Sequence, residues 1–441
     1  MKSDPSPLNE LKGFRLVFRA LSHRNYRLFF GGQGISLIGT WMQQIAVGWL
    51  VFRLTQSSFL LGVVGFTSRI PTFVFASFAG VLVDRWNRHR LLVATQVLSM
   101  IQAFILAALV LTGTVAVWHV ILLSLFLGLI NAFDVPARQS FVVEMIERRE
   151  DLGNAIALNS SMVNGARLVG PSIAGMLIAT VGEGMCFLLN GLSFIAVIAS
   201  LLAMRMTPKP RKEVTAPLWH GLKEGFTYAF GFAPIRSLLL LLALVSFMAM
   251  PYTVLMPVFA GKILHGGPQA LGFLLGATGV GALSGAIFLA SRKSVVGLGR
   301  IIVIASSLFG IGLIGFSFSR LFWLSLLLMV VTGYGMMVQM TSTNTVLQTL
   351  VDEDKRGRVM SFYTMAFMGM VPFGSLFAGT LASTIGTPET VLIGGISCIL
   401  GSILFARKLP LLRAMVRPIY MEKGILLQDS SSTIPPEDQG T

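Results

Sequence analysis

The sequence predicts an all-α polytopic membrane protein with twelve transmembrane helices arranged in two six-helix halves. Of its 441 residues, 54% are hydrophobic and only 12% are charged, and the mean hydropathy is +0.77. A soluble domain of average composition carries about twice that share of charged residues. Apolar runs of about 20 residues, the length that crosses roughly 30 Å of hydrocarbon, recur along the whole chain. Lysine and arginine are concentrated in alternate loops, which is typical of membrane topology.

The apolar runs fall into two sets on either side of the longest polar break. The first set is 27–52, 59–83, 91–112, 118–140, 154–181 and 185–204. The second set is 235–263, 271–291, 301–318, 321–348, 359–385 and 391–404. We therefore expect a basic amphipathic segment on the membrane surface, an N-terminal bundle, a cytoplasmic linker, a C-terminal bundle and a cytoplasmic tail. Their bounds are 1–26, 27–204, 205–234, 235–406 and 407–441.

The basic residues predict which side of the membrane each loop occupies. All but five of the 34 lysines and arginines lie on the side that holds both termini. The exceptions are Arg53, Lys262 and Arg320 in the opposite loops, and Arg69 and Arg167 inside membrane segments. Because such an excess marks cytoplasmic loops, we expect both termini in the cytoplasm and the protein in the cell membrane. The net charge of +15 is scattered over many short loops, so we expect no nucleic-acid partner.

The two halves are related in sequence. The string 170–182 matches 374–386, 204 positions later, at glycine, alanine, leucine and threonine positions without a gap. Transporters built from two repeats of this kind hold substrate between the halves, near the middle of the bilayer. The repeat therefore predicts a central cavity.

One turn between two apolar runs combines an acid with several basic residues. It reads Gly80-Val-Leu-Val-Asp84-Arg85-Trp-Asn-Arg88-His-Arg90. A carboxylate at the end of a membrane helix is costly and needs partners. The string resembles motif A of the major facilitator superfamily, a Gly-x-Leu-x-Asp-Arg-x-x-Arg-x-Arg/Lys turn between the second and third helices. The alternative is a generic basic loop that happens to contain an aspartate.

The resemblance extends over nearly the whole chain and implies a gate. In related transporters the motif A acid, the arginine four residues on and an acid near the end of helix four act together. Here these residues are Asp84, Arg88 and Asp134, which would form a cytoplasmic charge cluster that differs between states. The segments 23–30, 36–44 and 54–58 are similar to the enterobactin-exporter-like branch, and macrolide efflux proteins and lysophospholipid transporters are similar in the same region.

A glycine- and proline-containing stretch in the fifth helix bears on the direction of transport. Gly165, Gly170, Pro171 and Gly175 resemble motif C, a helix-five motif associated with exporters. Small residues permit close helix contact, and proline permits a bend. The motif is loose here, because Ala174-Gly175 stands where the family pattern has paired glycines.

Polar and cationic side chains within the membrane segments are the candidates for binding substrate. The first helix places five polar residues on one face: Gln33, Ser36, Thr40, Gln43 and Gln44. They line a wet cavity, or they join helices by hydrogen bonds.

Arg69 and Arg167 both fall near the middle of the bilayer, where an arginine costs at least about 2.5–3.5 kcal/mol. No acid lies at that depth in the sequence, so they suggest a cavity that accepts anionic groups. The structural alternative is that each arginine donates hydrogen bonds to backbone carbonyls that Pro71 or Pro171 leaves without a partner, or to a neighbour such as Asn164.

We therefore expect a secondary active exporter of a small amphipathic, siderophore- or drug-like molecule, working by alternating access, monomeric and coupled to protons. Motifs for a metal, a nucleophile or paired carboxylates are missing, so we expect no cofactor, no metal and no enzymatic activity. Two alternatives stay open: a lipid or lysophospholipid flippase on the same fold, and a polytopic membrane enzyme.

Overall fold

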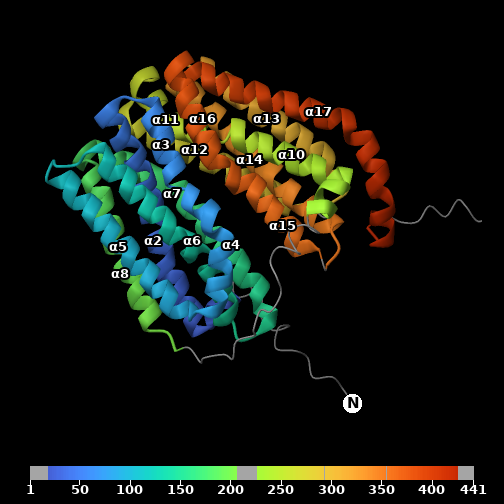
Figure 1. The fold of residues 1–441 in the computed structure, drawn as a ribbon, viewed down its shortest axis with the longest axis horizontal. Coiled ribbons are helices and arrows are strands. Elements are labelled where there is room, and N and C mark those ends of the chain that lie inside the picture. The colour runs from blue at the N-terminus through green and yellow to red at the C-terminus, as the bar shows by residue number, and fades with distance from the viewer. Residues whose placement is uncertain (1–17, 206–225, 293, 354, 426–441) are drawn as a thin grey trace, which may run out of the picture.

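The computed structural model describes residues 18–205, 226–292, 294–353 and 355–425, without the side chains of residues 76, 77, 80, 81 and 84. In this part of the chain, twelve spans are long and apolar enough to cross a membrane, and no strand is present. The predicted fold class is therefore confirmed. Figure 1 shows two helical bundles, one formed by the first half of the chain and one by the second.

The N-terminal bundle contains six spans. They are α2 (Arg24–Thr55), α3 (Ser58–Thr67) with α4 (Ile70–Arg85), α5 (Arg88–Leu111), α6 (Val117–Met145), α7 (Leu152–Val181) and α8 (Glu183–Leu202). The second span is divided because Arg69 leaves helical geometry, with φ −120° and ψ −24°, and Pro71 begins α4. Proline is tolerated in a first helical turn, where its missing N–H is not needed.

The C-terminal bundle has the same number of spans. They are α10 (Ala233–Met248) with α11 (Tyr252–Val258) and η4 (Phe259–Ile263), α12 (Gly267–Ala290), α13 (Leu298–Phe318), α14 (Phe322–Leu350), α15 (Arg356–Thr364) with η5 (Met365–Gly369) and α16 (Met370–Ile385), and α17 (Thr387–Glu422). The elements η4 and η5 are π-helical. The first and fifth spans of this half are thus the irregular ones.

The last helix is longer than the sequence pattern predicts. The apolar run ends at Leu404 and a tail is expected from residue 407, but α17 continues to Glu422 through Pro410 and Pro418. Leu412 and Tyr420 are buried, so this extension packs on the bundle. At the other end, the predicted amphipathic segment lies mostly outside the described residues, and residues 206–225 of the linker lie wholly outside them.

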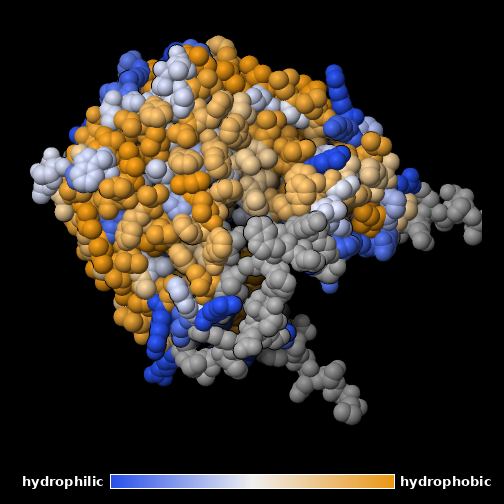
Figure 2. Space-filling view, viewed as in Figure 1, coloured by the Kyte–Doolittle hydropathy of each residue, from blue (hydrophilic) through white to orange (hydrophobic). Residues whose placement is uncertain are grey.

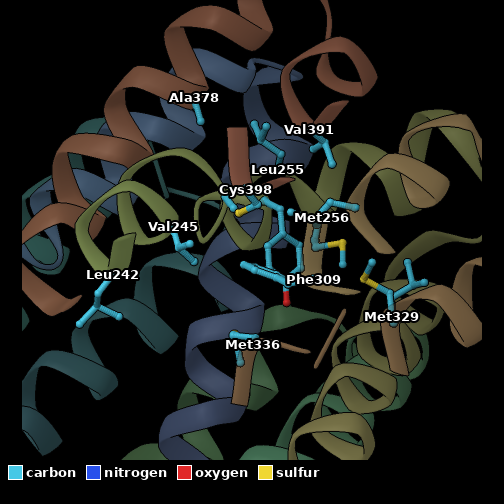
Figure 3. Close-up of a cluster of buried hydrophobic side chains, with 14 of the residues drawn as sticks. Leu242, Val245, Leu255, Met256, Phe309, Met329, Met336, Ala378, Val391 and Cys398 are labelled. Atoms are coloured by element: carbon cyan, nitrogen blue, oxygen red, sulfur yellow. The ribbon is translucent and has the colours of Figure 1, made fainter. Parts of the chain in front are cut away.

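The interior of the C-terminal bundle is closely packed. Figure 3 shows Leu242 and Val245 of α10, Met256 of α11 and Phe309 of α13 around Cys398. Cys398, like Cys186 in the other bundle, is a free, fully buried thiol. The outer surface is apolar as well: in Figure 2 the middle of the visible face is mostly hydrophobic, and hydrophilic residues gather toward its margins. This is the surface expected of a protein surrounded by hydrocarbon.

The two ends of the molecule differ in charge. We call the end that holds the α4–α5, α6–α7 and α12–α13 turns and the α17 extension the basic face. The other end is called the opposite face, and it holds the α2–α3 and α16–α17 turns. Arg85, Arg90 and Arg300 are exposed on the basic face, and Arg320 on the opposite face.

The bundles contact each other through pairs of glycines near the opposite face. Gly62 of α3 lies against Gly379 of α16, and Gly175 of α7 lies against Gly272 of α12. Gly175 and Gly379 are equivalent positions of the sequence repeat. In Figure 1 the bundles meet near α3, α11 and α16 and open away from those ends. The glycine crossings therefore bring the two bundles into close contact near the opposite face.

Candidate functional site

Arg167 of α7 lies between the bundles. Its guanidinium carbon is 5.8 Å from the centre of the Trp41 ring on α2, in the same bundle. Its Nη2 is 3.9 Å from the sulfur of Met336 on α14, in the other bundle. Arginine on an aromatic face and beside a thioether is held by weak, adaptable contacts, which a ligand can replace.

Local packing sets the position of Arg167. A Cβ added to Gly170 would lie 2.6 Å from the Cβ of Trp41, so only glycine lets α7 approach α2 this closely. The carbonyl of Arg167 lies beside Gly279 of α12, 3.5 Å from the position of a Cβ there. Asn164 donates to the carbonyl of Ser160 at 2.9 Å. The alternative that Arg167 satisfies backbone freed by Pro171, or Asn164, therefore stays open beside the cavity-facing prediction.

Arg69 occupies the break between α3 and α4. The far side of this break packs on α6, where Thr72 donates to the carbonyl of Gly128 at 3.2 Å. The side chain of Arg69 is exposed and is close enough to Arg167 for mutual electrostatic repulsion. Within the described residues, neither arginine forms an ion pair with an acid. Among the residues with described side chains, the two cations thus lie within electrostatic range of each other and neither is paired with an acid.

Tyr252, at the start of α11, adds a polar group to this region. Its hydroxyl is buried and interacts with the side chain of Thr278 on α12. It also lies within electrostatic range of Arg167. We call Arg69, Arg167, Trp41, Tyr252 and Met336 the central site.

The five polar residues of the first helix, α2, differ in how far they are exposed. Thr40 and Gln44 are exposed, as a cavity-lining role requires. Gln33, Ser36 and Gln43 are 4%, 1% and 3% exposed, so the prediction that all five residues line the cavity is corrected. The reason is that the helix turns this part of its polar face toward its own bundle.

Gln43 shows what the buried polar residues do. Its Nε2 donates to Oε1 of Gln102 at 2.9 Å, and its Oε1 accepts from Nδ2 of Asn190 at 2.7 Å. Gln102 in turn donates to the carbonyl of Leu123 at 3.3 Å. This chain links α2, α5, α6 and α8, and it satisfies polar groups that lipid cannot hydrate. Gln43 thus holds the N-terminal bundle together.

Two of the predicted gate residues, Arg88 and Asp134, have ion-pair partners on α6. Arg88, at the start of α5, pairs with Glu144 near the end of α6, at 2.5 Å. Asp134 instead forms its ion pair with Arg138, one turn further along α6. The side chain of Asp84, like residue Gly80, lies outside what the structure describes. Arg88 and Asp134 thus each have an ion-pair partner on α6, and the expected cluster of Asp84, Arg88 and Asp134 stays a prediction.

Asp134 is the most deeply buried of these acids, with 2% of its surface exposed. One oxygen accepts from Thr95 Oγ1 and from Gln96 Nε2, both at 2.8 Å. Its other oxygen meets Arg138. A buried carboxylate needs such donors, and here they tie α6 to α5. Arg85 and Arg90 remain exposed beside this region.

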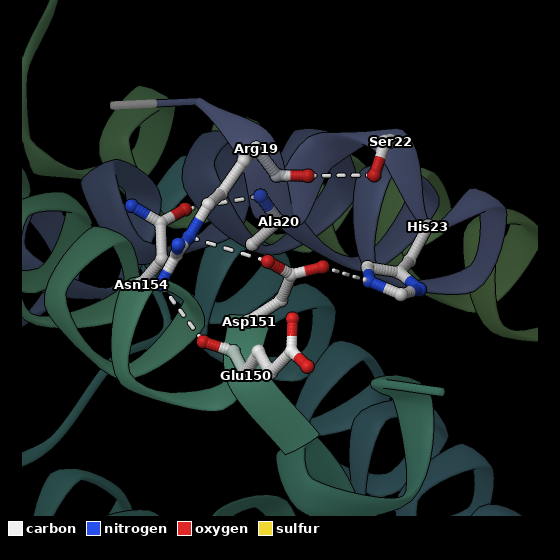
Figure 4. Close-up of polar contacts among 7 residues, drawn as sticks. All are labelled: Arg19, Ala20, Ser22, His23, Glu150, Asp151 and Asn154. Carbon is white, nitrogen blue, oxygen red and sulfur yellow. Dashed lines mark hydrogen bonds and ion pairs between the residues drawn. The ribbon is translucent and has the colours of Figure 1, made fainter. Parts of the chain in front are cut away.

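A further ionic group on the basic face was missed in the sequence. Figure 4 shows Asp151 between His23 and Arg19, with distances of 2.9 Å and 3.2 Å. Asn154 accepts from the backbone N–H of Ala20 at 3.0 Å. The available signal was an aspartate immediately before an apolar run, a position that favours a helix N-terminus. The group fastens the start of α2 to the start of α7.

The motif C-like residues lie mainly at helix contacts. Gly170 touches Trp41, and the carbonyl of Pro171 and the backbone of Gly175 lie against Gly272 of the other bundle. Gly165 is different, because a Cβ placed on it would meet no atom within 4 Å. The expectation of close helix contact is thus corrected for Gly165 alone. The other three residues take part in contacts of α7 with α2 or across the bundle interface.

Two repeated six-helix bundles with cationic and aromatic side chains between them define a transporter of the major facilitator superfamily. The family model described as "Transmembrane secretion effector" matches residues 17–420, so the chain belongs to that family. The fold is also that of solved transporters. The crystal structure of a bacterial homologue of the iron transporter ferroportin, in an inward-facing state, has a TM-score of 0.67 and 15% identity, and the match covers 87% of this chain and 98% of that one.

Characterised relatives are similar over most of their length. The staphyloferrin A transporter of Staphylococcus aureus is 27% identical over 384 residues, which are 86% of this chain and 95% of the relative. The multidrug efflux pump Tap of Mycolicibacterium fortuitum is 25% identical over 369 residues, 82% of this chain and 88% of the relative. The resemblance inferred from motif A is therefore confirmed.

Proposed function

We propose that this protein exports a small amphipathic, siderophore- or drug-like molecule across the cell membrane by alternating access. The observation that carries the proposal is the bridge made by Arg167, whose partners Trp41 and Met336 belong to different bundles. A ligand bound to Arg167 would contact both halves of the transporter, which move relative to each other during alternating access. The family, described as a transmembrane secretion effector, and the relative named as a multidrug efflux pump support this direction.

The orientation follows from charge. We place the basic face and both termini in the cytoplasm, because arginine and lysine concentrate there. With that orientation, the glycine contacts close the outer side and the central site belongs to an inward-facing state. The crystal structure of the ferroportin homologue is inward-facing as well, which supports the assignment.

Few strong bonds oppose a change to the outward-facing state. Near the opposite face, Lys262 donates to the carbonyl of Gln56 at 3.1 Å and lies over the ring of Phe52 at 5.8 Å. Ser58 and Thr387 are within 3.3 Å of each other. Exposed contacts of this kind contribute little, about 0–1 kcal/mol each. Such contacts suit an interface that must open in every cycle.

The central site indicates the chemistry of the substrate. Two guanidinium groups without a protein counter-charge favour a carboxylate, catecholate or phosphate. Trp41 and Met336 offer an aromatic face and a polarizable sulfur to an apolar or aromatic body. We therefore propose an anionic amphiphile as substrate, contacted by Arg167 and Arg69.

The test is substrate binding and efflux by Arg167→Lys and Arg167→Gln, with a panel of polycarboxylates, catechols, cationic drugs and lysolipids. We expect Gln to lower the affinity for anionic compounds about tenfold or more, and Lys to restore only part of it because it lacks the planar fork. Arg320→Gln is the matched control, since Arg320 bonds only to nearby carbonyls at the opposite face. If both Arg167 variants bind like the wild type and only melt earlier, the anion proposal fails.

We propose the proton gradient as the energy source and a monomer as the working unit. Described carboxylates such as Asp134 and Asp151 lie toward the basic face rather than beside Arg167. Efflux in vesicles with an imposed pH difference, and with the membrane potential clamped, tests the coupling. Transport that ignores the pH difference contradicts it.

A further inference from the structure

A second cavity lies on the basic face, away from the central site. It has a volume of about 390 Å³ and is enclosed by the α17 extension and the neighbouring ends of α10, α13 and α14. This volume falls within the roughly 300–1,000 Å³ of small-molecule sites. Most of its lining is apolar, including Leu238, Ile302, Phe405 and Leu412. The cavity arises because α17 continues past Leu404 and packs over the bundle through Leu412 and Tyr420.

The charged groups at this cavity are all of one sign. Its described lining residues include Arg300, Arg413 and Arg417 and contain no acid. Arg300, from the start of α13, is near enough to Arg413 of α17 for the two charges to repel each other. Both arginines are exposed, so water screens part of this repulsion, and an anionic group bound between them beside the apolar cavity would remove the rest.

The other side of the α17 extension indicates where this cavity sits in the membrane. Leu404, Leu411 and Met415 are 60%, 65% and 36% exposed. Such apolar side chains face hydrocarbon, whereas Arg407 and Lys408 on the same stretch are exposed cations. A helix with both features lies at the boundary between acyl chains and headgroups. The cavity therefore lies at the depth of the membrane where the phosphate of a phospholipid meets its acyl chains.

We propose that this cavity binds an anionic phospholipid of the inner leaflet, with an acyl chain against Leu238, Ile302 and Phe405 and the phosphate between Arg300 and Arg413. Basic pockets between helices on the cytoplasmic side of a membrane bind lipid headgroups, which makes this ligand chemically consistent. The lipid neutralises the two arginines and fills the apolar space beneath the extension. It is separate from the transported molecule, which is assigned to the central site between the bundles.

Native mass spectrometry of the full-length protein tests the proposal, with phosphatidylglycerol or phosphatidylcholine of identical acyl chains added to detergent micelles. We expect selective retention of phosphatidylglycerol. Each arginine contributes about fivefold in affinity, so Arg300→Gln with Arg413→Gln lowers the apparent affinity about 25-fold. The matched control is the double variant Arg407→Gln with Lys408→Gln. It also removes two positive charges, but both come from α17 residues that do not line the cavity. The control retains the lipid.

Two further measurements distinguish binding of the whole lipid from binding of its headgroup alone. Val416→Phe keeps every charge and narrows the cavity beside the proposed acyl-chain position, so it also lowers phosphatidylglycerol retention. Glycerol phosphate in large excess does not displace the lipid, because the acyl chain contributes to binding. Equal retention of both lipids, equal loss in the control pair, or full displacement by glycerol phosphate overturns the proposal. A thermal denaturation midpoint near that of the wild type verifies that each variant is folded.

Discussion

Gly175 of α7 and Gly272 of α12 touch backbone to backbone across the interface between the bundles. A Cβ built on either glycine would lie 2.9 Å from the Cα of the other, closer than real Cβ atoms come. The same relation holds between Gly379 and Gly62, where the distance from a Cβ on Gly62 is 2.8 Å. Closure of the opposite face therefore depends on glycine at both symmetry-related crossings.

Gly175→Val is expected to destabilise the closed opposite face, because overpacking at a tight contact costs about 1–3 kcal/mol. Gln56 of the N-terminal bundle and Ser383 of the C-terminal bundle both lie at the opposite face. Spin labels at these two positions should report a longer distance, and efflux should fall. The control is Gly165→Val, on the same helix but with no atom within 4 Å of a built Cβ. An unchanged distance in Gly175→Val contradicts the inferred role of the crossing.

Asp134→Asn is expected to lower the thermal stability of the N-terminal bundle. Removing one partner of a buried ion pair costs about 3–5 kcal/mol, and Asp134 also serves Thr95 and Gln96. Glu144→Gln, which breaks the half-exposed pair with Arg88, should cost about 1 kcal/mol or less. Thermal denaturation in detergent measures both variants. Similar losses for the two would show that burial of Asp134 does not matter.

Gln43→Leu is expected to destabilise the protein while leaving substrate affinity unchanged. Interhelical hydrogen bonds in membranes contribute about 0.6 kcal/mol each, up to about 1.7, and Gln43 makes two. The neighbouring Gln44 is exposed, so Gln44→Leu should leave stability intact and alter efflux. Melting curves and substrate titrations of the two variants separate these effects. If Gln43→Leu lowered substrate affinity and Gln44→Leu lowered stability instead, Gln43 would be assigned to the cavity.

Cysteine labelling tests the orientation. The two native thiols are fully buried, so a single cysteine introduced at Ser57, at Thr215 or at Ser430 supplies the reactive group. A membrane-impermeant maleimide on intact cells should label Ser57→Cys and spare the other two variants. Labelling of Ser430→Cys or Thr215→Cys from outside would place the basic face outside the cell.

The sequence is sufficient to predict the helices, because apolar runs of membrane length leave few other folds. It is less informative about partners. Arg88 and Glu144 are 56 positions apart, and their pairing depends on how α5 and α6 pack. The amphipathic continuation of α17 resembles a tail in sequence, because charged residues and two prolines interrupt its apolar pattern. Which polar residues of α2 face inward depends on helix rotation, which a stripe of five residues does not fix. The role of Asp84 in gating stays a prediction.

The pair of arginines without an acidic neighbour has an electrical consequence. If the substrate is an anion and protons move inward in exchange, each transport cycle moves the charge of both across the bilayer. In a cell whose interior is negative, the outward step of an anion gains about 2.3 kcal/mol per charge for every 100 mV. Membrane voltage then contributes directly to expelling the substrate, and the same voltage opposes its return.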